Sequence, residues 1–360
     1  MTVISDYRSV PVLKDASFPD DLEAITGDPA NHTLEVVIGL TDASDVVAFT
    51  RPQEGLTVAK AAIRLAGELP AHKPDYFLGY ARCLSVGASR LRGIGRLNEA
   101  DVTFALAYKS LRKVPGEHFA ERADYYRRLA FLRIDQRAFS TSLEIANHSR
   151  RHFEFAGHRH GVGCALVCRG TTYLYLERFD DAATDFRTAL DLLDRDLGFN
   201  HAWAASLNLA LVLIDGAKDR RGIEQAIRKL EEVAGLGCYE EGTIPDLSVS
   251  WAEARLLMKL RRYASAQVKL LGVCAGWQHL ELPYELTIAS LDLARCYFEQ
   301  NLQGELVQLA GRMFPLLTRF RHDTHAYRAL KAFHRAALAG RLEAALITFA
   351  RTAVEAAQVA

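Results

Sequence analysis

Small and apolar residues recur along the chain with the period of an α-helix, and short polar turns interrupt them. The clearest copy holds two helical runs around a turn at Glu177 and Arg178, with the pattern residues Gly170, Tyr173, Phe179, Ala182, Phe186 and Ala189. Residues three and four apart share one face of a helix. Each copy of the pattern therefore predicts two antiparallel helices joined by a tight turn.

The same pattern recurs with a period of about 41 residues, so the chain contains internal repeats. Small residues such as Gly170 and Ala182 let paired helices approach closely, while aromatic residues such as Phe186 fill the space between hairpins. The repeats predict helical hairpins over residues 76–113, 118–155, 160–197, 201–236, 246–275, 284–318 and 325–358. The expected fold class is all-α, an α-solenoid of about seven antiparallel helical hairpins.

The spacing of these pattern residues resembles the tetratricopeptide repeat (TPR) consensus. The resemblance covers about residues 76–358 and is strongest at 88–107 and 160–196. It implies a right-handed superhelix in which the first helix of each hairpin lines a concave groove, the usual binding surface of solenoids. The family repeat is about 34 residues, so helices or connections here must be longer. HEAT-type repeats share the longer period but lack the small-then-aromatic spacing, so we prefer the TPR interpretation.

Residues 1–50 do not join the repeat, and prolines at positions 11, 19 and 29 suggest a partly irregular N-terminal arm. Leu34–Leu40 is apolar and fits either a short strand or a helix. Thr57–Leu69 predicts an amphipathic helix that caps the stack. We therefore expect an arm over 1–50 and a helical repeat domain over 51–360, with Gly235–Pro245 as the most loop-like internal stretch.

Charge and cysteine content narrow the classes of function. Forty-four Lys and Arg balance forty-four Asp and Glu, which argues against a general nucleic-acid or membrane-surface binder. The N-terminus lacks a signal-peptide pattern, and no apolar stretch reaches the roughly 20 residues of a membrane span. Six scattered cysteines without a CxxC motif are expected to stay reduced: Cys83, Cys164, Cys168, Cys238, Cys274 and Cys296. We expect a soluble cytoplasmic protein.

Two clusters carry candidate chemistry. Cys164 and Cys168 lie four residues apart with His158 and His160 upstream, and two Cys with two His could bind a metal. Both cysteines fall where the repeat needs small apolar residues, so we prefer a packing role and predict no metal and no cofactor. Basic residues around 148–160 could contact phosphate or an acidic partner, but a solvated loop between hairpins is the preferred interpretation: His148, Arg150, Arg151, His152, His158, Arg159 and His160.

No enzyme motif is evident in the sequence. Adjacent acidic pairs such as Asp180–Asp181 point in different directions on a helix and make poor acid–base pairs. Motifs of phosphate loops, zinc proteases, serine hydrolases and dinucleotide-binding folds are missing. We therefore predict that the protein is not an enzyme.

The predicted register places arginine and aromatic side chains in the groove. These residue types dominate binding hot spots, and an acidic or aromatic-bearing peptide would suit them. Some of them would instead pack against the neighbouring hairpin. The candidate partner-binding residues are Arg82, Arg92, Arg127, Phe131, Tyr175, Trp251, Arg255, Arg295, Phe298 and Tyr327.

The leading hypothesis is an interaction scaffold or regulatory adaptor that binds a segment of a partner protein in the groove. The resemblance implies settings such as bacterial signalling, transcription regulation or defence, by analogy of fold. The alternatives are a sensor for a small peptide or metabolite, an enzyme with an unrecognised site, and, disfavoured by the neutral charge, an RNA-binding solenoid. The sequence identifies neither the partner nor the oligomeric state.

Overall fold

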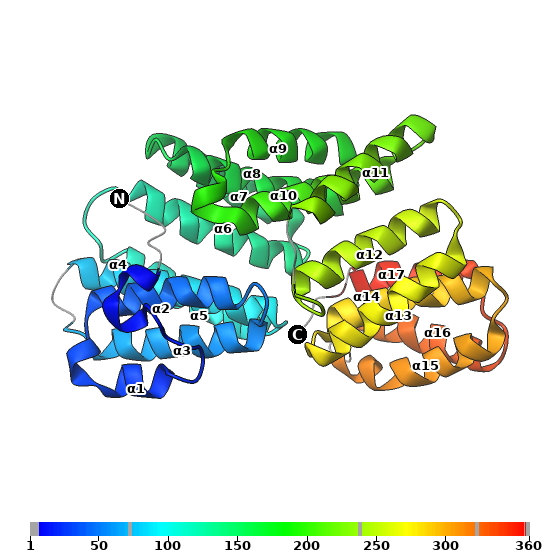
Figure 1. Cartoon of the computed structure of the whole chain (residues 1–360), viewed down its shortest axis with the longest axis horizontal. Helices are drawn as coiled ribbons and strands as arrows, with labels where there is room; N and C mark the ends of the chain where they lie inside the picture. Colours follow the sequence, from blue (N-terminus) through cyan, green and yellow to red (C-terminus); the bar gives the residue numbers. More distant parts are fainter. Residues whose placement is uncertain (1–6, 71–73, 237–239, 321–323, 356, 358–360) are drawn as a thin grey trace. The chain divides into compact units, whose positions relative to one another are not determined.

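A computed structural model describes residues 7–70, 74–236, 240–320, 324–355 and 357 of the chain. Over these residues the secondary structure is α-helix with four short 3-10 segments and no strand (Figure 1). The 3-10 segments are η1 (Tyr7–Ser9), η2 (Pro11–Leu13), η3 (Pro29–Asn31) and η4 (Thr318–Phe320). The expected all-α class is confirmed.

Helices occupy all seven predicted hairpins, and in six of them the two helices pack against each other. Helices α10 (Arg195–Gly216) and α11 (Arg220–Gly235) occupy the fourth predicted hairpin. The six packed pairs are α4 (Pro74–Gly93) with α5 (Leu97–Leu111), α6 (Phe119–Asp135) with α7 (Phe139–Phe155), α8 (Arg159–Tyr175) with α9 (Phe179–Leu192), α12 (Ile244–Lys259) with α13 (Tyr263–His279), α14 (Pro283–Glu299) with α15 (Gln303–Leu317), and α16 (Thr324–Leu338) with α17 (Ala344–Glu355).

The N-terminal region adds a further hairpin ahead of α4. Its helices are α2 (Leu34–Val47) and α3 (Pro52–Glu68), which contact each other and α4. The hydroxyl of Thr33 accepts a hydrogen bond from the N–H of Val36 and so caps α2. The apolar Leu34–Leu40 segment is therefore helical. The sequence predicted a single capping helix here, but the structure has a hairpin of two helices. The predicted boundary after residue 50 lies in the turn between α2 and α3.

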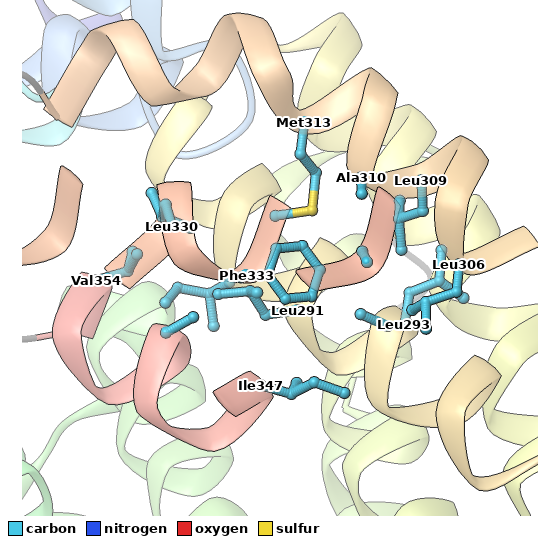
Figure 2. Packing of buried hydrophobic residues seen from close by; sticks show 14 of the residues in the cluster. Leu291, Leu293, Leu306, Leu309, Ala310, Met313, Leu330, Phe333, Ile347 and Val354 are labelled. Carbon is cyan, nitrogen blue, oxygen red and sulfur yellow. The ribbon is translucent and has the colours of Figure 1, made fainter. Parts of the chain in front are cut away.

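The chain divides into two compact units, unit 1 over residues 1–208 and unit 2 over 209–360, with the boundary inside α10. At the start of unit 1, α1 (Leu22–Gly27) and the 3-10 segments pack on the α2–α3 hairpin around Leu13, Val37 and Leu40. The core of unit 2 is centred on helices α14 to α17. Figure 2 shows the buried side chains of Leu291, Met313, Leu330, Phe333 and Ile347 packed together there.

Close approach of paired helices depends on small residues at the predicted positions. A Cβ atom added at Gly170 of α8 would lie 2.9 Å from Cε1 of Phe186 in α9. Phe186 is fully buried, as are Ala182 and Ala189 on the same helix. Because a packed aromatic ring has no room to shift by this amount, Gly170 lets the two helices of the hairpin meet at this distance.

The turns between paired helices share one geometry. A residue with positive φ follows the first helix: φ is 80° at Gly95, 56° at Glu177 and 66° at Gly340. In the α8–α9 turn, the N–H of Arg178 then donates to the carbonyl of Tyr173, five residues back, at 2.9 Å. This is the Schellman arrangement, which satisfies carbonyls at a helix end and suits glycine. The turn at Glu177 and Arg178 is the one that the clearest copy of the sequence pattern predicted.

The structure predicts that Glu177→Gly raises the free energy of unfolding by up to about 1 kcal/mol, because glycine adopts positive φ without the Cβ penalty. Urea unfolding followed by circular dichroism measures the change. Glu144→Gly is the matched control at an exposed position inside α7, where glycine lowers stability by about 1 kcal/mol. A similar loss in both variants would contradict the turn geometry.

Candidate functional site

Ion pairs in unit 1 join the first helices of successive hairpins. Nη1 of Arg92 on α4 donates to Oδ2 of Asp135 on α6 at 2.7 Å. Arg82 on α4 pairs in the same way with Asp42 on α2. The partners are 43 and 40 residues apart, close to one repeat, so equivalent faces of neighbouring first helices meet. We call this surface the charged face of unit 1; it comprises Asp42, Asp45, Arg82, Arg90, Arg92, Asp124, Arg127, Arg128 and Asp135.

The centre of the charged face of unit 1 is a network of shared carboxylates. Arg128 donates to Oδ2 of Asp45 and to Oδ2 of Asp124, each at 2.7 Å. Nη2 of Arg90 lies 3.0 Å from Oδ1 of Asp45. Nε of Arg127 donates to Oδ1 of Asp124 at 3.1 Å. Each aspartate in the network thus contacts two guanidinium groups, which fixes donors and acceptors from α2, α4 and α6 in place.

The network keeps both carboxylates ionised. Burial raises the pKa of Asp45, but the charges of Arg128 and Arg90 outweigh it and hold that pKa well below its usual range. For Asp124, the opposing effects are again burial and the charges of Arg128 and Arg127, and its pKa is also held far below normal. At neutral pH the surface therefore presents fixed charges of both signs.

Aromatic side chains lie beside these charges. The guanidinium carbon of Arg92 is 5.4 Å from the ring centroid of Phe131, on the neighbouring helix α6. Tyr175, at the end of α8, stacks on Phe139 with the centroids 6.1 Å apart, and Arg137 lies over its ring at 4.7 Å. Tyr175 remains 43% exposed, so part of its ring is available for contact.

Unit 2 carries a similar surface, built with the same spacing. Nε1 of Trp251 on α12 donates to Oδ2 of Asp292 on α14 at 2.9 Å, across 41 residues. Nη2 of Arg255 donates to both carboxylate oxygens of Asp215 at 2.7 and 2.8 Å, across 40 residues. Nε of Arg351 on α17 approaches Oδ1 of Asp292 at 2.9 Å. We call Asp215, Trp251, Arg255, Asp292 and Arg351 the charged face of unit 2.

The structure places the ten predicted groove residues in several different environments. Arg82, Arg92, Trp251 and Arg255 lie in pairs between first helices and keep part of their surface exposed. Arg127 is 8% exposed and serves the network, while Phe298 and Tyr327 pack against the core of unit 2. Arg295 pairs with Glu299 on its own helix. Phe131 and Tyr175 stand beside arginines, as described above.

Sequence reasoning placed Asp124, Asp135 and Asp215 in the groove but missed three other acidic partners, Asp42, Asp45 and Asp292. Asp42 and Asp45 fell in the expected arm, and Asp292 was not singled out. A signal was available, because Asp42 precedes Arg82 by one repeat and Asp292 follows Trp251 by one repeat. A search for complementary side chains one period apart would have found both.

The histidine and cysteine residues are arranged differently from the predicted quartet. Nδ1 of His158 accepts a hydrogen bond from the N–H of Gly161 and caps α8. Sγ of Cys168 faces the carbonyl of Arg127 at 3.8 Å. His160 and Cys164 instead meet His201 of α10, and possible ligand atoms of these three residues lie within 4.8 Å of one another. Cys238 lies outside the described residues.

The basic cluster near residue 150 was predicted as a loop, but most of it lies on helix α7. Arg150 pairs there with Glu154, one turn along the helix. The ring of Tyr126 on α6 lies against His148 and His152, with centroids 6.1 and 5.4 Å away. The apolar pattern of Ala146 and Phe153, both buried, continues the helix through the charged positions.

Comparison with known proteins identifies the fold. No family model matches the chain, and no curated protein sequence matches it either. A structure of a Rap protein complexed with competence and sporulation factor has a TM-score of 0.66 at 11% identity, over 88% of this chain and 85% of that one.

Two further solved structures share the fold. The Rap conjugation gene regulator of plasmid pLS20, in complex with the Phr* peptide, has a TM-score of 0.51 at 13% identity, over 87% of this chain and 96% of that one. The Cut9–Hcn1 hetero-tetramer of the APC/C has a TM-score of 0.55 at 12% identity, over 93% and 58%. The chain therefore has a TPR-like helical-repeat fold, as its repeat pattern predicted.

No helix in the described ranges is both long and apolar enough to cross a membrane.

The charge network predicts a pH-dependent loss of stability in Asp124→Asn. We expect a loss of about 2 kcal/mol at pH 7, between the values for exposed and fully buried ion pairs, because two guanidinium groups lose a shared carboxylate. A depressed carboxylate pKa stabilises the fold above the unfolded-state pKa of about 4, and this contribution fades as pH falls. The difference between variant and parent in urea unfolding should therefore shrink below about pH 4.

Asp181→Asn is the control for this prediction, because Asp181 forms an exposed ion pair with Arg178 near the start of α9. Its effect should stay below about 1 kcal/mol. If Asp124→Asn lost the same stability at pH 7 and pH 3, the carboxylate charge would not be the cause.

Proposed function

We propose that the chain is a regulatory scaffold that binds a peptide, or an extended segment of a partner protein, on its charged faces. The observation that carries this proposal is the pairing of fixed donors and acceptors between first helices at the repeat spacing, which occurs within unit 1 (Asp42 with Arg82) and separately within unit 2 (Trp251 with Asp292).

The chemistry of these faces suits the backbone of an extended peptide. Such a peptide offers an N–H donor and a carbonyl acceptor at each residue. Arginine side chains can donate to the carbonyls, and aspartates can accept from the N–H groups. Because salt bridges between helices already hold these side chains, little conformational entropy remains to be lost on binding.

Aromatic residues beside the charges supply apolar contact area. Phe131 and Tyr175 in unit 1, and Trp251 in unit 2, are partly exposed next to arginine or aspartate. Arginine and aromatic residues are enriched at binding hot spots. We propose Arg82, Arg92, Phe131, Tyr175, Trp251 and Arg255 as contact residues, with Arg127 as support inside the network.

The expected preference for an acidic partner is replaced by a different proposal. Arg82, Arg92 and Arg255 each have a carboxylate partner already, so an acidic ligand would have to compete with aspartates fixed at the same surface. A peptide of mixed charge, held largely through its backbone, fits these faces better.

The two Rap structures, one solved with competence and sporulation factor and the other with the Phr* peptide, support a peptide as the ligand, because their fold matches most of this chain. One of them is a gene regulator. By this analogy we propose a regulatory role in which peptide binding alters the association of the chain with a partner protein.

Reversal of individual ion pairs tests the proposal. A random peptide library is selected on the full chain, and enriched peptides are measured by fluorescence polarisation. The variants Arg92→Asp/Asp135→Arg and Arg255→Asp/Asp215→Arg keep an ion pair at each place but invert its direction. We expect at least one of them to weaken binding of the enriched peptides about 10-fold or more, which corresponds to about 1.4 kcal/mol.

The control Arg178→Asp/Asp181→Arg inverts an exposed pair within α9, and should leave binding unchanged. Circular dichroism confirms that all variants are folded. Unchanged binding in both charged-face variants, or no enriched peptide at all, contradicts the proposal.

A further inference from the structure

Three metal-ligating side chains meet between α8 and α10 in unit 1. His160 and Cys164 lie four residues apart on one face of α8, and His201 comes from α10. His160 is 6% exposed and Cys164 is 4% exposed. One possible ligand atom from each residue can be chosen so that all three lie within 4.8 Å of one another.

Two ring nitrogens in this cluster lack the hydrogen bonds that burial demands. Nε2 of His160 and Nδ1 of His201 are both buried, and neither has a hydrogen-bond partner. An unsatisfied buried polar atom costs about 1–3 kcal/mol, so two of them at one place call for an explanation. A bound ion would supply it, because it would take the lone pair of Nδ1 of His201 and, once the ring proton of His160 has moved to Nδ1, the lone pair of Nε2 of His160.

We propose that Nε2 of His160, Sγ of Cys164 and Nδ1 of His201 bind a divalent transition-metal cation, with Zn²⁺ as the best match. Two imidazoles and a thiolate form a ligand set that Zn²⁺ prefers, and a fourth position stays open to water or another ligand. Bond lengths of about 2.1 Å to nitrogen and 2.3 Å to sulfur place tetrahedral ligands roughly 3.5 Å apart. Small side-chain rotations close the difference from the observed spacing.

Metal binding requires a defined movement of protons. Nδ1 of His160 accepts a hydrogen bond from the N–H of Asp194 at 3.1 Å, so its neutral ring carries the proton on Nε2. Coordination through Nε2 moves that proton to Nδ1 and breaks the bond to Asp194, in the connection between α9 and α10. The thiol of Cys164 releases its proton to solvent, so one proton leaves for each ion bound.

Proton release and the charged groups around the cluster determine how its affinity for the ion varies. Because the Cys164 thiol must lose its proton to bind the ion, affinity for the ion should rise as pH rises. Arg127 and Arg128 on α6 oppose a cation, whereas Asp124 on α6 and Asp45 on α2 favour it. His158 and Asp194 also act on His160, with opposite effects. The thiolate ligand cancels one charge of the ion, which limits the repulsion from the arginines.

Metal titration of the full chain tests the site. The protein is first treated with a chelator, and Zn²⁺ binding is then followed by calorimetry at pH 6.5 and 8. We expect one ion for each chain, with tighter binding at the higher pH. Co²⁺ serves as a spectroscopic probe, because one thiolate ligand gives a sulfur-to-cobalt charge-transfer band. X-ray absorption of the loaded parent protein should show one sulfur ligand, a result that requires no variant.

Variants then assign the ligands. Cys164→Ser should abolish the charge-transfer band, and His201→Gln should weaken Zn²⁺ binding at least 10-fold. Cys168→Ser is the matched control, a buried cysteine one turn further along α8 whose thiol faces the carbonyl of Arg127. It should keep both the band and the affinity. No Zn²⁺ binding by the parent, a band that survives in Cys164→Ser, or loss of binding only in Cys168→Ser would each overturn the proposal.

Discussion

The structure depends on close antiparallel packing of the two helices in each hairpin. Gly170 meets the ring of Phe186 at a distance that excludes even a Cβ atom, and the Schellman turn at Glu177 brings the second helix back at once. Because the two helices of each hairpin pack in the same way, equivalent positions on the first helices recur along the sequence at nearly the same period. The residue separations of 40, 41 and 43 in pairs between first helices follow from this repetition.

Repetition of the face explains how charged side chains from neighbouring first helices hold one another in place. An aspartate on one first helix accepts a hydrogen bond from an arginine or tryptophan one repeat away. Asp215 accepts from Arg255 in this way, and Asp292 accepts from Trp251. Such pairs desolvate both partners in part and fix their directions, which is the property a binding surface needs. His201 likewise follows His160 by one repeat, so the candidate metal cluster is another product of the same register.

The repeat pattern of the sequence was sufficient to predict the helices from α4 to α17 and their packing in six hairpins, because small and aromatic residues mark both helices and glycine or polar residues mark the turns. It did not predict the α2–α3 hairpin, because α2 buries Thr41, Asp42 and Ser44 where the pattern expects apolar residues. Residue type and register singled out Arg82, Arg92, Trp251 and Arg255 as candidates, and the structure shows each of them paired with an aspartate on another first helix. Their partners depend on register between helices about 40 residues apart, which periodicity on one helix does not fix.

The central claim is that ligands bind the faces formed by the first helices. Hydroxyl-radical footprinting of aromatic side chains, with and without a saturating enriched peptide, tests it most directly. Tyr175 and Trp251 represent the first helices, while Tyr108, Phe155 and Phe314 are exposed on second helices. The account predicts that the peptide protects Tyr175 or Trp251 and leaves the other three unchanged. Protection confined to Tyr108, Phe155 or Phe314 would contradict it.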